Sequence, residues 1–421
     1  MIKAQCCIVG GGPAGMMLGF LLARAGVKVV VLEKHGDFLR DFRGDTVHPS
    51  TLNVMEELGL LDDFLKLPHH KISRFAGQFG DTRVEIADLS HLPVRCRFIA
   101  MMPQWDFLDF LAARGRRYAG FTLLMHAEAR ELIEEDGRVV GVRATVNGNA
   151  EEIRADLVVG ADGRHSTVRE RLGIKVHDIG APMDVLWFRV PRESTDPDGV
   201  TFIVGAGLGL VLIDRGDYFQ VAYVIPKDGY EKVRAAGLDA LVENVGKLAP
   251  SLAGRTDALK SWDDVSKLTV VIDRLPRWHH DGALLIGDAA HAMSPMGGVG
   301  VNLAVQDAVA AARLLAPHLR AARDGGVIPG AMFRSLDSQL ARVQRRRWFP
   351  TVATQLLQRV LARGVVARVL QSDRPLPVPG FVKLAQRFPI LQGLPARAVA
   401  IGFLPEHLGP ELAQAGRPGE R

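Results

Sequence analysis

The chain has 421 residues, which is enough for two or three domains with a sizeable core. Hydrophobic residues make up 48% and charged residues 24%, which is ordinary for a globular protein. The net charge of +5 is mild, and no aromatic residues interleave with the basic ones, so a nucleic-acid partner is not expected.

The N-terminal segment carries the first functional signal. Residues 2–9 predict a buried strand, residues 16–26 predict a helix that is apolar nearly all round, and residues 27–34 predict a second strand ending near Glu33. Between the first strand and the helix, a Gly-x-Gly-x-x-Gly spacing is filled by Gly10, Gly12 and Gly15. A glycine triplet alone is a weak signal, but strand, glycine turn, helix, strand and terminal acid in this order are a strong one.

Each of these residue types has a physical role in holding an adenine dinucleotide. Gly10 permits the tight turn, Gly12 lets backbone N–H groups approach a pyrophosphate, and Gly15 lets the helix pack against the strand. The partial positive charge of the helix N-terminus favours the phosphates. Glu33 can accept hydrogen bonds from both ribose hydroxyls. The alternative is a glycine-rich turn without a ligand.

The cysteines lie mostly in this same segment. Cys6, Cys7 and Cys96 are too few for a disulfide framework, so we expect a reducing compartment, and cytoplasm is the predicted location. Cys6 and Cys7 lie inside the first predicted strand and are expected to be small core residues. No uninterrupted apolar window reaches about 18 residues, so no membrane-spanning helix is expected.

Two later apolar strands also end at an acid. Residues 157–174 run from an apolar strand into Asp162 and Gly163, and residues 282–291 run into Gly287 and Asp288. Two further acids at strand ends would be redundant for NAD. They suit a longer cofactor, whose ribityl chain and tricyclic ring need extra anchors.

Together these three stretches resemble the class A FAD-dependent flavoprotein monooxygenases, the aromatic hydroxylase family that includes p-hydroxybenzoate hydroxylase. The resemblance runs from residue 1 to about residue 316. It implies an α/β fold with a Rossmann-like FAD-binding domain, an interleaved antiparallel-sheet substrate domain and a C-terminal helical region. The implied boundaries are 1–72, 101–180 and 271–330 for the FAD-binding domain, 73–100 and 181–270 for the substrate domain, and 331–421 for the helical region.

The resemblance also assigns cofactor-binding positions. In addition to Gly10, Gly12, Gly15 and Glu33, these are Pro13, Ala14, Lys34, Arg43, Gln104, Asp162, Gly163, Gly287, Asp288, Pro295, Gly298, Gly300, Val301 and Asn302. Asp288 would accept a hydrogen bond from a ribityl hydroxyl. The family pattern Asp-Gly-x-x-Ser-x-x-Arg continues from Asp162 and Gly163 to Ser166 and Arg169.

Several of these positions have structural alternatives. Arg43 can simply pair with Asp41 or Asp45 on the surface. Gln104 can owe its place to the preference for polar side chains in a first helical turn. Arg169 can be a structural ion-pair residue.

The implied chemistry needs no catalytic side chain and no metal. Reduced flavin reacts with O₂, and in this family a flavin C4a-hydroperoxide oxygenates the substrate, with NADPH or NADH as the reductant. Backbone at Pro295, Gly298 and Gly300 would lie against the isoalloxazine ring. A helix beginning near Gly300 would direct its N–H groups at the anionic reduced flavin. His291 is interpreted as a structural residue, because acid–base work requires reach to a substrate proton.

Alternating apolar residues in 73–100 and 181–270 predict the sheet that covers the substrate side of the flavin. The inward-facing candidates for substrate contact are Trp187, Phe202, Leu212 and Tyr223. A small apolar substrate, aromatic or polycyclic, is expected to be hydroxylated or epoxidised. The alternatives are a same-fold flavoprotein that inserts no oxygen, such as a double-bond reductase, and a non-catalytic binding protein.

The C-terminal part is basic and in places apolar. From Arg334 onward basic residues greatly outnumber acids, and the run Arg345, Arg346, Arg347 is predicted to be a solvated helix face. Contact with anionic lipid or another protein is the alternative. Residues 388–407 are apolar enough to cover an apolar pocket or touch a membrane surface, so peripheral membrane contact is possible. The chain is expected to be a monomer or a homodimer.

Overall fold

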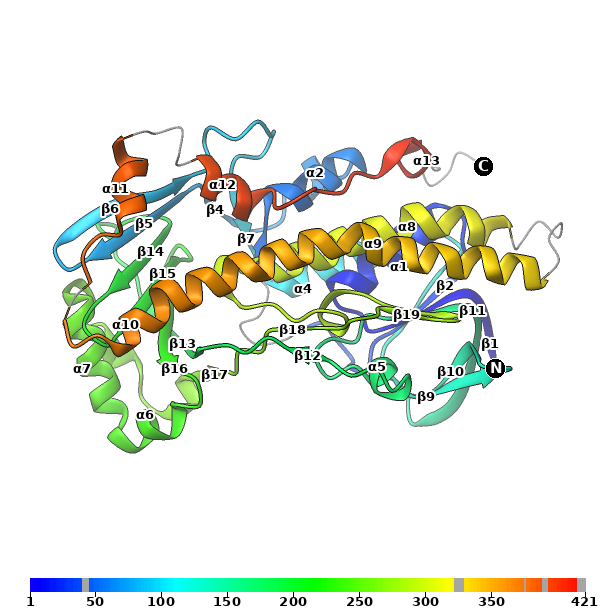
Figure 1. The fold of residues 1–421 in the computed structure, drawn as a ribbon, viewed down its shortest axis with the longest axis horizontal. Coiled ribbons are helices and arrows are strands. Elements are labelled where there is room, and N and C mark those ends of the chain that lie inside the picture. The colour runs from blue at the N-terminus through cyan, green and yellow to red at the C-terminus, as the bar shows by residue number, and fades with distance from the viewer. Residues whose placement is uncertain (40–44, 322–328, 375, 388–392, 415–421) are drawn as a thin grey trace.

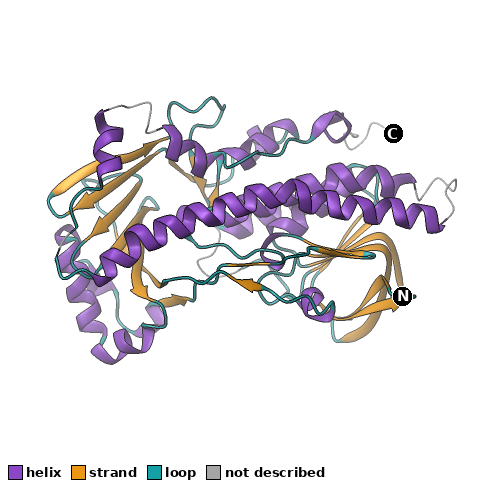
Figure 2. Cartoon of the chain, viewed as in Figure 1, coloured by secondary structure: helices purple, strands orange, loops and turns teal. Residues whose placement is uncertain are grey.

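The computed structural model describes residues 1–39, 45–321, 329–374, 376–387 and 393–414. Two sheets lie at opposite ends of an elongated molecule, and the long helix α9 (Pro329–Leu361) runs between them (Figure 1). Helices and strands alternate in the sheet lobe that carries the N-terminus, while the other lobe is built mainly of strands with a helical cover (Figure 2).

The first sheet has eight strands, and five of them run parallel in the order β20-β11-β1-β2-β8. Its strands are β1 (Ile2–Val9), β2 (Val29–Leu32), β8 (Phe121–Leu124), β9 (Ala127–Glu135), β10 (Arg138–Val146), β11 (Asn149–Gly160), β19 (His279–His280) and β20 (Ala283–Leu285). The central strand β1 is apolar because both faces of a parallel sheet are covered. Cys6 and Cys7 are fully buried there, which confirms that they are core residues. Burial raises the pKa of Cys7 to about 12.

Three helices cover one face of this sheet: α1 (Pro13–Arg24), α4 (Gln104–Gly115) and α8 (Gly300–Ala321). The short helix α5 (Thr167–Arg171), the β9–β10 pair and the buried Trp278 cover the other face. Among the described residues, one helical stretch, Met296–Ala321, which joins the turn before α8 to α8 itself, is long and apolar enough to cross a membrane, but 78% of its apolar window is buried inside the protein. That burial is typical of a core helix.

The second sheet has seven strands in the order β17-β13-β16-β15-β14-β5-β6. Its strands are β5 (Arg74–Phe79), β6 (Thr82–Asp88), β13 (Met183–Pro191), β14 (Val200–Val204), β15 (Gly209–Asp214), β16 (Tyr218–Pro226) and β17 (Ser266–Leu268). Helices α6 (Tyr230–Ala236) and α7 (Leu238–Leu248) cover one face. All seven strands lie within the two segments expected for the substrate domain; the domain boundaries themselves stay a prediction.

Smaller elements join the two lobes. They are β3 (Thr46–Val47), β4 (His70–Ile72) and β7 (Ile99–Met101), which form one sheet, β12 (His177–Asp178) and β18 (Asp273–Arg274), which form another, and the helices α2 (Pro49–Glu57) and α3 (Leu61–Phe64). The C-terminal part then contributes α10 (Ala367–Gln371), α11 (Gly380–Arg387), α12 (Gly393–Ala400) and α13 (Gly409–Gln414). Helix α12 packs on β6, whereas α13 returns to α8, so this part of the chain contacts both lobes.

The arginine run 345–347 differs from its prediction as a solvated face. Arg345 is exposed, but Arg346 bonds to the buried carboxylate of Glu406 at 2.7 Å, and Arg347 is only 1% exposed. Because α9 packs on α8 along this stretch, consecutive arginines point to different environments.

His48 is a fully buried histidine at the start of α2, and its Nδ1 lies 2.8 Å from the carbonyl oxygen of Val399. Burial lowers the pKa of His48 to about 4, against 6.5 for an ordinary histidine. The unfolded chain therefore binds a proton more readily between these two pH values, so stability is lost as the pH falls from 6.5 toward 4.

We predict that His48 accounts for a loss of about 3 kcal/mol in unfolding free energy over that pH window. Replacing it by glutamine should flatten the pH dependence by that amount, as measured by denaturant unfolding at several pH values. The exposed His91→Gln variant is the control and should keep the wild-type slope. Equal slopes for His48→Gln and wild type would contradict the prediction.

Candidate functional site

The carboxyl ends of four neighbouring parallel strands meet at one edge of the first sheet. Backbone hydrogen bonds continue past the strands there: Gly10 N to Leu32 O at 2.8 Å, Ala161 N to Val9 O at 2.8 Å and Ile286 N to Gly160 O at 3.0 Å. Glu33, Asp162 and Asp288 follow the ends of β2, β11 and β20, so the structure brings the predicted acids to the same edge. Such an edge is where open α/β sheets bind their ligands.

The glycine turn after β1 is shaped by close backbone approaches. Gly10 has φ +106°, and a Cβ there would lie 2.4 Å from the carbonyl oxygen of Ala161. A Cβ on Gly15 would lie 1.9 Å from the carbonyl oxygen of Gly10. Gly12, by contrast, adjoins open space, with no atom within 4 Å of an added Cβ. It caps α1, whose first turn starts with Pro13 and Ala14 and contains no acid, so the N-terminus of α1 is open to an anion.

Glu33 is held by the backbone around it. Its Oε2 accepts from the N–H of Gly11 at 3.0 Å and its Oε1 from the N–H of His35 at 3.1 Å. The side chain is 8% exposed, while Lys34 beside it is exposed. These bonds fix the Glu33 carboxylate at the end of β2, where the dinucleotide fingerprint expects the acid that binds the ribose.

The two later acids have different surroundings. Asp162 accepts from Ser166 Oγ at 2.5 Å and from the N–H of Val168 at 3.2 Å, so its carboxylate caps α5. Any cofactor contact there would come from the backbone of Asp162 and Gly163. Asp288 is half-buried, and within the described ranges its Oδ2 accepts from Arg164 Nε at 3.1 Å while its Oδ1 has no hydrogen-bond partner.

Arg169 donates to the carbonyl oxygen of Ala289 at 3.1 Å and to that of Arg164. These bonds join the turn after β11 to the turn after β20, which supports the structural alternative for Arg169. Gly287 lies two residues after the end of β20 and, like Gly10, has a positive φ, of +61°. Hydrogen bonds between these turns therefore stabilise the edge of the sheet where the site lies.

The loop from Pro295 to Gly300 leads directly into α8. Gly297 and Gly298 have φ values of +77° and +63°, and a Cβ on Gly298 would lie 2.5 Å from Thr46 Oγ1. Thr46 Oγ1 donates to the carbonyl oxygen of Gly298 at 2.7 Å, which fixes the loop. Gly300 adjoins open space where α8 begins, so backbone can approach a planar ring there.

Asn302 and Val301, the next predicted contacts, are buried in the first turn of α8. Asn302 Oδ1 accepts from the N–H of His48 at 2.9 Å and from Thr51 Oγ1 at 2.7 Å. The amide of Asn302 therefore ties α8 to α2, and its side chain is not free for a cofactor. Gln104 is the half-buried first residue of α4, and Arg43 lies outside the described residues.

Asp307 is a buried acid beside the candidate site, and the sequence reasoning did not single it out. Its fully buried carboxylate accepts from the N–H of Gly287 at 3.1 Å, faces His291 Nε2 at 2.6 Å and accepts from Arg347 Nε at 2.9 Å. Burial would raise the pKa of Asp307, but His291 and Arg347 outweigh it and hold the pKa below its usual value. His291 is 1% exposed, in keeping with its structural interpretation. An acid inside the apolar run VNLAVQDAVAAARLL is the signal that could have found Asp307.

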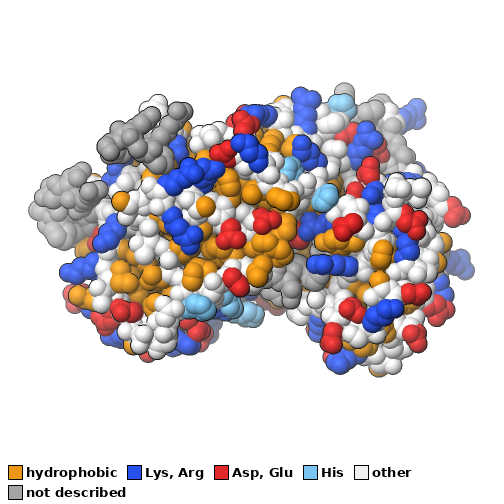
Figure 3. All heavy atoms as spheres, turned by 180° about the vertical axis from the view of Figure 1, so that it is seen from behind, with side chains coloured by type: hydrophobic (Ala, Val, Ile, Leu, Met, Phe, Trp, Pro, Cys, Tyr) orange, Lys and Arg blue, Asp and Glu red, His pale blue; other side chains and the backbone are white. Residues whose placement is uncertain are grey.

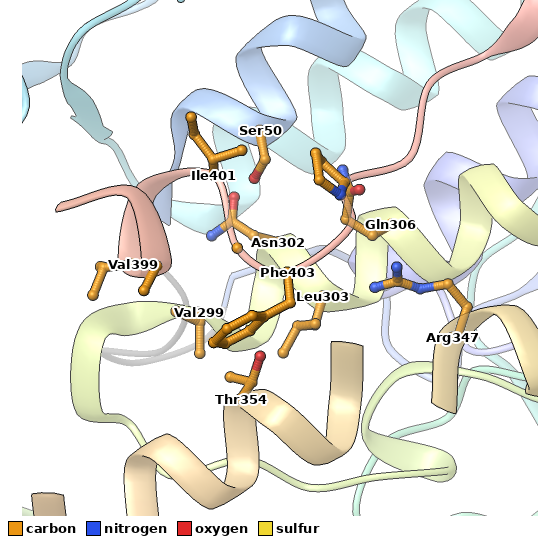
Figure 4. A pocket seen from close by; sticks show the side chains of 13 residues that line it. Ser50, Val299, Asn302, Leu303, Gln306, Arg347, Thr354, Val399, Ile401 and Phe403 are labelled. Atoms are coloured by element: carbon orange, nitrogen blue, oxygen red, sulfur yellow. The ribbon is translucent and has the colours of Figure 1, made fainter. Parts of the chain in front are cut away.

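A small pocket lies between α8, α9 and the segment 398–405 (Figure 4). Val299, Asn302, Leu303, Gln306, Arg347 and Phe403 are among its lining residues. Its lining includes Val299 of the predicted flavin loop and Asn302 of α8. Gln306 Nε2 and Arg347 Nη1 are buried without a hydrogen-bond partner in the described part of the chain. Polar groups of this kind in a small cavity suit bound water.

The four substrate candidates divide between the two faces of the second sheet. Trp187, Ala222, Val211 and Phe202 are consecutive Cα partners and form one row. Phe202 packs against a cluster that includes Met101 of β7. Because β7 pairs with β3, whose Thr46 binds the 295–300 loop, we infer that this row faces the site. Leu212 and Tyr223 instead pack against α7 on the opposite face, so the four candidates do not share one face of the sheet, and their roles as substrate contacts stay predictions. Both faces of this sheet are covered, so apolar residues occur on both. The alternation of residues along a strand therefore does not predict which face a given apolar side chain occupies.

Comparison with known proteins agrees with this site. Residues 3–328 match a family described as an FAD binding domain. The chain is 35% identical over 316 residues to 6-methylpretetramide 4-monooxygenase of Streptomyces rimosus, covering 75% of each chain. The chain belongs to the class A FAD-dependent flavoprotein monooxygenases.

Two further matches report similarity in sequence and in fold. It is 28% identical to a rifampicin monooxygenase of Streptomyces venezuelae, covering 72% of this chain and 61% of that longer protein. The probable FAD-dependent monooxygenase PqsL of Pseudomonas aeruginosa has the same fold, with a TM-score of 0.72, 22% identity, and coverage of 88% of this chain and 97% of that one.

FAD is the cofactor of this flavoprotein monooxygenase. The described residues fit it, because the open N-terminus of α1 at Gly12 suits a pyrophosphate and the half-buried carboxylate of Asp288 suits a ribityl hydroxyl. The open backbone at Gly300 suits a flat ring. The individual residue assignments stay predictions.

We predict that Asp288→Ala weakens FAD binding by roughly tenfold or more, since a hydrogen bond to a charged group contributes about 1.5–3 kcal/mol. The FAD dissociation constant of the apoprotein, followed by flavin fluorescence, measures this. Asp198→Ala is the control, because Asp198 pairs with Arg192 in the other lobe as Asp288 pairs with Arg164. Unchanged FAD affinity in Asp288→Ala would show that Asp288 is not an anchor.

We further predict that Asp307→Asn lowers the unfolding free energy by about 3–5 kcal/mol, because it removes the nearer of the two charge partners of the buried Arg347 and leaves only Glu406, at 3.8 Å. Denaturant unfolding measures the change. Asp136→Asn, in an exposed turn with φ +50° that asparagine tolerates, should be nearly neutral. A loss for Asp307→Asn as small as that of the control would refute a bracing role for the buried carboxylate.

Proposed function

We propose that this flavoprotein hydroxylates or epoxidises a small apolar substrate, aromatic or polycyclic, with NADPH or NADH as the reductant and O₂ as the co-substrate. The observation that carries the proposal is the apolar row of Trp187, Ala222, Val211 and Phe202 on the site side of the second sheet. This row would cover a flat apolar substrate against the 295–300 loop. One oxygen atom of O₂ would enter the substrate, and the other would leave as water with the two electrons of the reductant.

Bound FAD, once reduced, supplies the activation of O₂ in this family. The chain's own residues would bind the cofactor and orient it. The N-terminus of α1 would hold the pyrophosphate, Glu33 the ribose and Asp288 the ribityl chain. The first-turn N–H groups of α8 would place partial positive charge beside the ring and stabilise its anionic form. The apolar row would exclude water from the reacting face.

The substrate class is supported by the relatives' names. The S. rimosus relative is named for oxygenation of 6-methylpretetramide, and another S. rimosus relative, 28% identical, is named for 12-dehydrotetracycline and anhydrotetracycline. We infer a substrate of related, polycyclic aromatic character. We also infer a reducing location such as the cytoplasm, because Cys6, Cys7 and Cys96 are all buried free thiols.

The proposal predicts substrate-dependent oxidation of NAD(P)H that is matched by O₂ uptake. With polycyclic phenols as substrates and ¹⁸O₂ as the gas, mass spectrometry should find one labelled oxygen atom in the product. Reduction of the flavin without O₂ uptake for every substrate tested would favour a flavoprotein that inserts no oxygen.

A matched pair of variants tests the substrate face. Trp187→Leu should raise KM several-fold and leave FAD affinity unchanged, because the side chain belongs to the row that faces the site. Tyr223→Phe, on the face covered by α7, should leave both unchanged. The opposite ranking of the two KM values would show that the other face binds the substrate.

A further inference from the structure

Helix α9 carries an apolar stripe on its outer side. Phe349, Leu356 and Val360 are 57%, 56% and 59% exposed, although they are large apolar residues. Their spacing of seven and four residues places them on one side of a helix. The ring of Phe403 lies against that of Phe349, with centroids 6.5 Å apart. These four residues and Leu404 are called the α9 stripe below.

Leu404 extends this surface in an unusual backbone conformation. It has φ +46°, a left-handed conformation that is costly for a branched, bulky side chain, and it is 65% exposed. A strained residue that presents an apolar side chain to solvent gains nothing from packing. Such outliers are concentrated at functional surfaces.

The segment of chain that carries most of the α9 stripe is basic. Residues 338–372 contain seven arginines and neither Asp nor Glu. Arg346 and Arg347 are engaged with Glu406 and Asp307, whereas Arg345, Arg359 and Arg363 are exposed and have no ion pair within the described part of the chain. On the opposite face of the molecule, basic and acidic side chains lie intermixed (Figure 3). The stripe is therefore apolar at its centre and basic at both ends.

The exposed apolar residues and the exposed arginines together limit which kind of partner can bind the α9 stripe. A second copy of the chain, placed there by a two-fold axis, would bring arginines against arginines. The outer side of a helix is convex, so it matches a flat, deformable surface. An anionic lipid surface accepts apolar side chains below its headgroups and pairs its phosphates with arginine.

We propose that the α9 stripe is a peripheral docking surface for anionic lipid membranes. Phe349, Leu356, Val360 and Leu404 would enter the headgroup region, while Arg345, Arg359 and Arg363 would contact lipid phosphates. This docking does not depend on the proposed substrate or reaction. It would place the long axis of α9 along the membrane plane.

Co-sedimentation of the FAD-loaded protein with vesicles tests the proposal. Vesicles of phosphatidylcholine with phosphatidylglycerol should bind the protein, phosphatidylcholine alone should bind it far less, and high salt should release it. The triple variant Phe349→Ser/Leu356→Ser/Val360→Ser should bind at least about tenfold more weakly. The charge variant Arg345→Gln/Arg359→Gln/Arg363→Gln should lose the preference for anionic vesicles.

The control is Val176→Ser, which changes an exposed apolar residue, 41% accessible, outside the stripe and should bind like the wild type. Flavin content and thermal unfolding check that every variant is folded. The proposal is overturned if wild type fails to bind anionic vesicles, if the triple variant binds as well as wild type, or if light scattering shows a dimer that only the triple variant disrupts.

Discussion

The buried carboxylate of Asp307 holds together the segments that form the candidate site. A charge without access to water is costly unless charge and hydrogen bonds surround it, and here Gly287, His291 and Arg347 do so. These partners belong to the turn after β20, to the segment that follows it and to α9. Because one carboxylate on α8 holds all three, the positions of Asp288 and of the N-terminus of α8 are set relative to each other.

The site itself is made mostly of backbone. Helix N-termini at Gly12 and Gly300 adjoin open space, and the turns around them are braced by Thr46, Asn302 and Arg169. A cofactor that performs the chemistry needs position, charge stabilisation and the exclusion of water more than it needs acid or base groups. The polar side chains near the site can therefore hydrogen-bond to other parts of the chain instead of contacting the cofactor.

Sequence reasoning succeeded where the signal was local. The glycine turn, the strands around it and the start of α8 follow from spacing and periodicity, because each depends on neighbours in the chain. It failed for Arg347, whose burial depends on the packing of α9 on α8. It also could not foresee that Asp162 caps α5 and that Asn302 ties α8 to α2, because these partners are set by the fold. The sequence could not tell which face of the second sheet Leu212 and Tyr223 occupy, because an apolar strand covered on both faces has no polar side to orient it.

A crystal structure of the FAD-bound protein is the most direct test of the central claim, which is that the cofactor lies along the carboxyl ends of β2, β1, β11 and β20. It should show the pyrophosphate at the N-terminus of α1 beside Gly12, the ribityl chain at Asp288 and the isoalloxazine ring against the 295–300 loop. A ring bound away from that loop, or a pyrophosphate away from Gly12, would contradict the account.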